Sequence, residues 1–143
     1  MTRIDFYFNA ANKIDTVCRL ASKAARLRNK VLIFTLSEEL ARTLDKAMWL
    51  FQPTGFVPHC RAESPLAPET GVVIARALED LTHDQILVNL DTKPPPAFSR
   101  FLRLIEIVST TEEDRTAARL RFRFYKDRGY EINNHDLSRN EGA

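Results

Sequence analysis

The pattern of apolar and polar positions predicts a chain in which strands and helices alternate. Short apolar or aromatic runs of strand length are separated by segments whose apolar residues recur with helical spacing. The run at 31–35, VLIFT, is continuous, which is typical of a parallel strand buried on both faces. The expected strands are 4–8, 31–35, 71–75, 85–90 and 102–108, with a short edge strand at 130–133, and the expected helices are 12–28, 37–50 and 112–128.

Residues at the predicted helix ends support this division. Ser37 is a suitable N-cap, either Thr110 or Thr111 can cap the last helix, and Gly129 stands where a C-terminal glycine is expected. The order of elements predicts an α/β domain in three layers, with a largely parallel sheet and helices on both faces. We expect one domain over 1–137 and a flexible C-terminal tail over 138–143.

Charge and composition narrow the classes of function. The formal net charge is only +2, from 21 basic and 19 acidic residues, which argues against a protein that coats nucleic acid. A signal peptide and an apolar run long enough for a membrane span are both missing, so a soluble cytoplasmic protein is expected. Cys18 and Cys60 lack metal-ligand spacing, and Cys18 is expected in the core.

The sequence lacks the motifs for nucleotide binding, metal binding and nucleophilic catalysis that α/β proteins often contain. None of the four glycines forms GxGxxG or GxxxxGK[ST], and the turn after the first strand, 9–12, reads NAAN. The three histidines have no HxxxH or HExxH spacing, and no serine lies in a GxSxG elbow. We therefore expect no catalytic residues, no cofactor and no metal.

The last predicted helix carries a basic ridge. Four basic side chains fall within about a quarter of its circumference, and Phe122 lies at their edge. This ridge could be a solvated face, a site for a short acidic peptide with a hydrophobic end, or a surface for single-stranded nucleic acid with bases stacked on the ring. The ridge is Arg115, Arg119, Arg123 and Lys126, and the opposite half, expected to pack on the sheet, is Ala117, Ala118, Leu120, Phe124 and Tyr125.

A second feature surrounds Trp49. The residue lies about 180° from Leu40 on the wheel of its helix, so it is expected to face away from the core. Further aromatic residues and prolines follow within ten positions. Clusters of exposed aromatic residues often mark a protein interface, although the loop could also fold back and cover the indole ring.

The sequence at these two places resembles the chi subunit of bacterial DNA polymerase III. The resemblance rests on LDKAMW at 44–49, FVPH at 56–59 and RFYKDRGYEIN at 123–133, and it covers about residues 4–137. It implies a Rossmann-like fold without a phosphate-binding loop. It also implies a non-catalytic replication subunit that reaches DNA only indirectly and binds no membrane.

The resemblance implies two partners with separate sites. The acidic, Phe-terminated tail of single-stranded-DNA-binding protein would bind the first, and the clamp-loader subunit psi the second, where a repair helicase could also bind. Phe122 stands where the family often has Tyr, Arg115 and Arg123 stand where it often has Lys, and the 60–70 segment is short. The tail site would be Val108, Arg115, Arg119, Phe122 and Arg123, and the psi site Trp49, Phe56, Val57, Pro58 and His59.

Two other functions stay open on sequence grounds. One is direct binding of single-stranded nucleic acid through the basic helix, which several stacking aromatic residues along a groove would favour. The other is a degenerate nucleotide-dependent enzyme, which a glycine-rich loop would favour.

Overall fold

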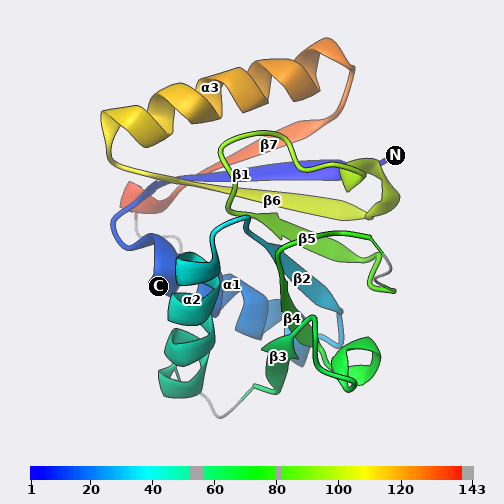
Figure 1. The fold of residues 1–143 in the computed structure, drawn as a ribbon. Helices are drawn as coiled ribbons and strands as arrows, with labels where there is room; N and C mark the ends of the chain where they lie inside the picture. Colours follow the sequence, from blue (N-terminus) through cyan, green and yellow to red (C-terminus); the bar gives the residue numbers. More distant parts are fainter. Residues whose placement is uncertain (52–56, 80–81, 140–143) are drawn as a thin grey trace.

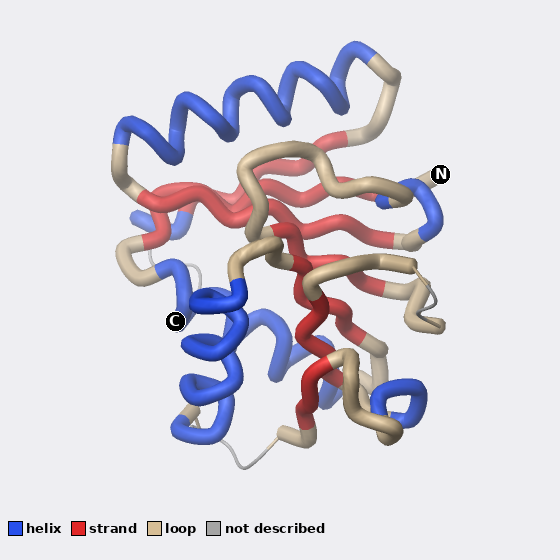
Figure 2. Tube along the Cα trace, in the orientation of Figure 1, coloured by secondary structure: helices blue, strands red, loops and turns tan. Residues whose placement is uncertain are grey.

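The fold is built on a parallel sheet with helices on both faces. The computed structural model describes residues 1–51, 57–79 and 82–139, and within them the sheet has seven strands in the order β3-β4-β2-β5-β6-β1-β7. Helices α1 and α2 cover one face and α3 crosses the other (Figures 1 and 2). The strands are β1 (Arg3–Ala10), β2 (Val31–Phe34), β3 (His59–Arg61), β4 (Val72–Ala75), β5 (Ile86–Asn89), β6 (Arg103–Ser109) and β7 (Ile132–Asp136), and the helices are α1 (Lys13–Arg26), α2 (Glu38–Leu50) and α3 (Glu112–Asp127).

The predicted three-layer α/β architecture is confirmed. All strand pairs are parallel, so each chain reversal needs a crossover, and α1, α2 and α3 supply three of them. The sequence did not predict β3, which is only three residues long, and it placed the edge strand β7 two residues too early. Three short 3-10 helices complete the described elements: η1 (Ala67–Glu69), η2 (Phe98–Arg100) and η3 (Leu137–Arg139).

Each face of the sheet buries its own apolar core. Consecutive strand residues point to opposite faces, so Ile33 packs under α1 and α2 whereas Leu32 packs on the side of α3. Cys18 lies in the first core and is 1% exposed, as expected. None of the residues in the strands β2, β4, β5 and β6 is exposed. Their sequences therefore lack the alternation of apolar and polar residues that is typical of half-buried strands.

The helix ends follow the predicted capping residues. Ser37 accepts a hydrogen bond from the backbone of Leu40, and Thr111, rather than Thr110, caps α3 by accepting one from Asp114. Gly129 has a φ of 81°, which a glycine adopts without strain where the chain turns from α3 toward β7.

Helix α3 presents a different face to the sheet than predicted. Leu120 was expected to pack inward, but it is 65% exposed. Ala118 and Tyr125 are buried as expected, and between them Arg121, which is only 2% exposed, takes the central position. The reason is a carboxylate in the sheet below: Glu106 on β6 is fully buried and pairs with the guanidinium of Arg121.

The described residues include only the beginning of the predicted C-terminal tail. Leu137–Arg139 form η3, and residues 140–143 lie outside the described residues, so the flexible tail over 138–143 stays a prediction. Over the described ranges, none of the helices combines the length and the apolar character needed to cross a membrane.

Candidate functional site

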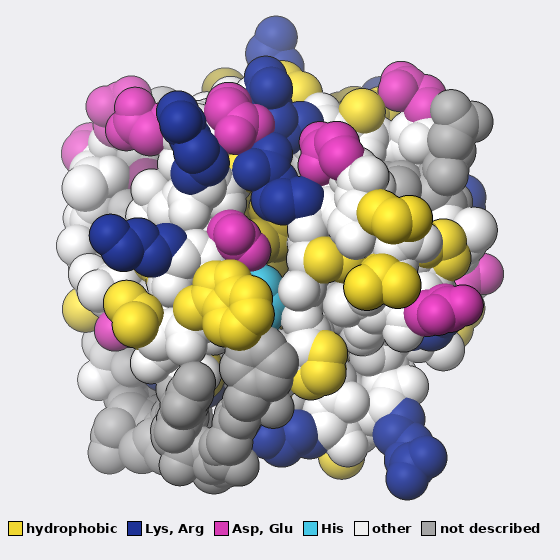
Figure 3. All heavy atoms as spheres, turned by 60° about the horizontal axis from the view of Figure 1, so that its bottom comes forward, with side chains coloured by type: hydrophobic (Ala, Val, Ile, Leu, Met, Phe, Trp, Pro, Cys, Tyr) yellow, Lys and Arg dark blue, Asp and Glu magenta, His cyan; other side chains and the backbone are white. Residues whose placement is uncertain are grey.

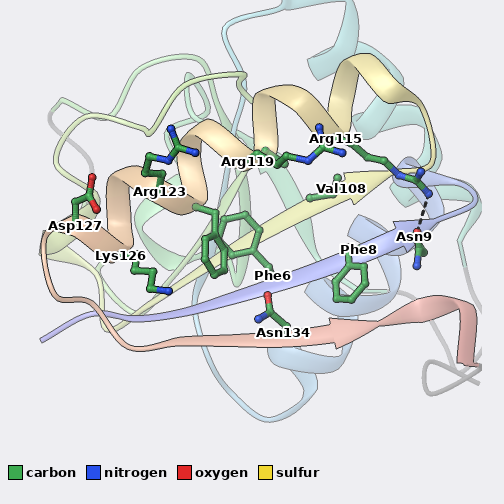
Figure 4. Close-up of a pocket in the computed structure, with 12 residues that line it drawn as sticks. Phe6, Phe8, Asn9, Val108, Arg115, Arg119, Arg123, Lys126, Asp127 and Asn134 are labelled. Atoms are coloured by element: carbon green, nitrogen blue, oxygen red, sulfur yellow. Dashed lines mark hydrogen bonds between the residues drawn. The ribbon is translucent and has the colours of Figure 1, made fainter.

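A groove runs along α3 on the face of the sheet opposite α1 and α2. Its volume is about 830 Å³, and Figure 4 shows its side chains converging from α3, β1, β6 and β7. The groove lies between α3, which packs on β6, and the neighbouring strands β1 and β7, and side chains from all four elements line it. The lining residues are Phe6, Phe8 and Asn9 on β1, Val108 on β6, Asn134 on β7, and Arg115, Ala118, Arg119, Phe122, Arg123, Lys126 and Asp127 on α3.

The floor of the groove is apolar and aromatic. Phe6 meets Phe122 edge to face, with 5.4 Å between the ring centroids, and its ring lies 6.1 Å from that of Tyr125. Val108 is buried beside them, and Phe8 is half-buried at the strand end. Edge-to-face pairs fix ring orientations, so this floor is a preformed surface on which an aromatic or aliphatic group can pack.

The rim of the groove on α3 is basic. Arg115 donates a hydrogen bond to Asn9, and Arg119 pairs with Glu112 at 3.3 Å, where both side chains are largely exposed. No acid in the described part of the chain forms an ion pair with Arg115, Arg123 or Lys126. An apolar floor beneath unneutralised cations favours a ligand that combines a carboxylate with an aromatic or aliphatic group.

All five residues predicted for the tail site line this groove. Val108, Arg115, Arg119, Phe122 and Arg123 come together as the helical wheel and the family resemblance suggested. Four further residues, on the opposite wall, were not predicted, because the pattern of one helix does not show which strands lie beside it. The missed residues are Phe6, Phe8, Asn9 and Asn134; the aromatic DFYF run of the first strand was an available signal for Phe6 and Phe8 alone.

A buried polar network holds α3 on the sheet beneath the groove. The guanidinium Nε of Arg121 donates to Glu106 Oε1 at 2.9 Å, and Tyr125 and Asn89 donate to the other carboxylate oxygen at 2.5 Å and 3.0 Å. Burial raises the pKa of the Glu106 carboxyl, and the charge of Arg121 with the two other donors opposes that rise. Burial and the neighbouring carboxylate raise the pKa of Tyr125 far above its usual value, so it stays a hydrogen-bond donor.

The second candidate surface lies at the end of α2, on the other side of the molecule. Trp49 is 55% exposed, as its position on the helical wheel predicted, and its ring packs edge-on against His59, 4.9 Å between centroids. Figure 3 looks onto this end of the molecule, where hydrophobic, basic and acidic side chains lie close together.

The other residues predicted for the psi site do not all reach the surface. Val57 is 5% exposed and belongs to the core under α1 and α2, whereas Pro58 is exposed. The side chain of His59 is buried; its Nδ1 donates to the Val57 carbonyl at 3.0 Å, and its Nε2 lies 3.5 Å from Asp45. His59 therefore supports the Trp49 ring from below. Phe56 lies outside the described residues.

The described residues contain no cluster of three or more His, Cys, Asp or Glu side chains that could hold a metal ion. Burial, reinforced by Asp15, raises the pKa of the Cys18 thiol to about 11, so that this cysteine stays a thiol at neutral pH.

Comparison with known proteins identifies the family of this chain. The family described as "DNA polymerase III chi subunit, HolC" matches residues 1–133. The chain belongs to the chi-subunit family of DNA polymerase III. Three curated relatives of the family carry the name DNA polymerase III subunit chi. They are 34% identical in Pseudomonas aeruginosa (97% of this chain, 99% of the relative), 28% in Haemophilus influenzae (92% and 95%) and 27% in Escherichia coli K12 (82% and 80%).

Membership in the chi family confirms the resemblance drawn from the sequence and places the chain among the subunits of DNA polymerase III.

Proposed function

We propose that this protein is a non-catalytic cytoplasmic adaptor of the replication machinery. It ties the clamp loader, through psi, to the C-terminal tail of single-stranded-DNA-binding protein. The observation that carries the proposal is the groove of α3, which joins an aromatic floor to a basic rim in one preformed site. In this assembly the chain touches DNA only through its partners.

The proposed tail ligand matches the groove in chemistry. Its terminal phenyl ring packs on Phe122 and Val108, while its carboxylates approach Arg115, Arg119 and Arg123. Exposed ion pairs contribute only about 0–1 kcal/mol each, so the arginines mainly orient the peptide and speed its association. The buried ring contributes more of the binding free energy, since burying a Phe side chain gives about 1.5–3 kcal/mol.

The proposed psi site is centred on Trp49. A tryptophan that is 55% exposed and held in place by a buried histidine is a suitable anchor for a protein partner. It lies at the end of α2, whereas the groove lies along α3 on the opposite face of the sheet (Figure 1). The two partners can therefore bind at once, and a repair helicase could use the Trp49 surface in place of psi.

Fluorescence anisotropy of a labelled acidic peptide, with and without its terminal Phe, tests the tail site. The peptide that ends in Phe should bind, and the shortened one should lose most of its affinity. Phe122→Ala should weaken binding, whereas Leu120→Ala, which truncates an exposed residue of the same helix outside the groove, should not.

Equal binding of the two peptides would contradict the tail site. The groove would then be a generic basic surface, and direct binding of single-stranded nucleic acid would become the better proposal.

A further inference from the structure

The end of β1 departs from regular strand geometry where it reaches the groove. Tyr7 pairs with Ile107 and Ala10 with Ser109, so three steps along β1 correspond to two along β6. Asn9 is the residue in this bulge with a left-handed backbone, at φ 62°. Phe8 and Asn9 are consecutive, and in a regular strand they would point to opposite faces, yet both line the groove. The bulge therefore turns the Asn9 side chain into the groove.

The Asn9 amide bridges the two walls of the groove at this end. Its Oδ1 accepts a hydrogen bond from Arg115 Nη2 on α3 at 3.0 Å, and its Nδ2 donates to Asp136 Oδ1 on β7 at 2.9 Å. Figure 4 shows the bond to Arg115. Because the guanidinium can only donate and the ionised carboxylate can only accept, the two partners fix the orientation of the amide. Asn9 thus presents an oxygen to Arg115.

The amide of Asn9 is an uncharged hydrogen-bond acceptor, and this property matters for the binding of an anionic ligand. Two neighbouring cations are held by acids, Arg119 by Glu112 and Lys13 by Asp114, each at 3.3 Å, and each acid offsets part of the charge that it holds. Asn9 is neutral, so it orients the Arg115 guanidinium without neutralising it. A guanidinium has five N–H donors, and the bond to Asn9 uses one of them.

We infer that Asn9 is a positioning residue of the groove, which holds the Arg115 guanidinium in place with its charge available to a carboxylate of the ligand. The nature of that ligand, an acidic peptide, rests on the proposed function. An arginine that is already oriented loses less rotamer entropy on binding than a free one.

Asparagine also tolerates a left-handed backbone, so a purely structural role for Asn9 has to be separated from a positioning role. Asn9→Gly makes that separation, because glycine keeps the backbone geometry and removes only the amide. Asn9→Asp keeps an oxygen in the same place but adds a negative charge beside Arg115. Asn9→Ala is unsuitable, since alanine at φ 62° would strain the backbone.

The first test measures the affinity of the Phe-terminated acidic peptide for these variants. Asn9→Gly should weaken binding about threefold to tenfold, because an Arg115 side chain that is no longer held must be immobilised when the peptide binds. Asn9→Asp should weaken it further, because its carboxylate competes with the carboxylate of the peptide. In an Arg115→Ala background, Asn9→Gly should have less than about a twofold effect. If Asn9→Gly weakens binding equally in both backgrounds, Asn9 does not act through Arg115.

The second test needs no ligand. In nitrogen-15 spectra of the free protein, the guanidinium of Arg115 should show slow rotation, and Asn9→Gly should make this rotation fast while leaving that of Arg119 unchanged. Unchanged Arg115 signals in Asn9→Gly would overturn the positioning role. A wild-type chain that fails to bind the peptide would contradict the proposed function instead, and the spectra would still decide whether Asn9 orients Arg115.

Discussion

Replacing Arg121 by methionine should destabilise the domain strongly, because it removes the cation that compensates a fully buried carboxylate. The Arg121 side chain is 2% exposed and that of Glu106 is 0% exposed, and the ion pair between them spans 2.9 Å. Arg121 also donates to the Thr92 carbonyl at 3.1 Å. Removing one partner of a buried ion pair costs about 3–5 kcal/mol, a large part of the roughly 5–15 kcal/mol that stabilises a typical domain.

The loss of folding stability in Arg121→Met should depend on pH in a defined direction. Burial already raises the folded-state pKa of Glu106, and without the charge of Arg121 it should rise further. A carboxyl group with a raised folded-state pKa favours folding below its unfolded-state pKa and loses that contribution as the pH rises through the folded-state value. Arg121→Met should therefore lose more stability at about pH 8 than at about pH 5, where more of Glu106 can be protonated.

Urea unfolding followed by circular dichroism at both pH values measures these effects. Arg123→Met is a matched control, since it makes the same chemical change on the exposed side of the same helix and should alter stability by less than about 0.5 kcal/mol. Adding Glu106→Gln to Arg121→Met should recover part of the loss, because the buried charge is then gone. If Arg121→Met cost no more than Arg123→Met, the network would not anchor α3.

Three further outcomes are expected. Trp49→Ala should weaken psi binding by about 2 kcal/mol or more in calorimetry, with little change in unfolding free energy; a variant that unfolds would show that Trp49 is structural. Arg119→Ala should weaken tail-peptide binding by about fivefold or less, since exposed ion pairs contribute about 0–1 kcal/mol. Arg119→Glu should weaken it more, because the new carboxylate repels the peptide and faces Glu112; equal effects would contradict an electrostatic role. Calorimetry with nucleotides should detect no saturable binding, and a micromolar dissociation constant would overturn that expectation.

Most of the fold could be predicted because each long element has a strong local signal. The buried parallel strands appear as continuous apolar runs, and Ser37 and Thr111 cap the N-termini of their helices by bonds that involve only nearby residues. β3 lacks such a signal, because it has only three residues, each of intermediate exposure, and it forms a strand only beside β4. The polar strand β7 likewise depends on its neighbour β1.

The site could be predicted only on the helix. The wheel of α3 places its basic residues and Phe122 together, but the opposite wall comes from strands far away in the sequence. Asn9 could not be found, because its role depends on a bulge in β1. Leu120 was expected inside, but Arg121 takes the buried position, because the helical wheel cannot show that the carboxylate of Glu106 lies beneath the helix as a partner for a buried cation.

In the proposed function, one chain holds two partners at separate sites. The most direct measurement is the affinity of the Phe-terminated tail peptide for this protein, free and saturated with psi. We expect the same dissociation constant in both cases and a ternary complex of one copy of each partner, because α3 and the end of α2 lie on opposite faces of the sheet. Displacement of the peptide by psi would contradict it.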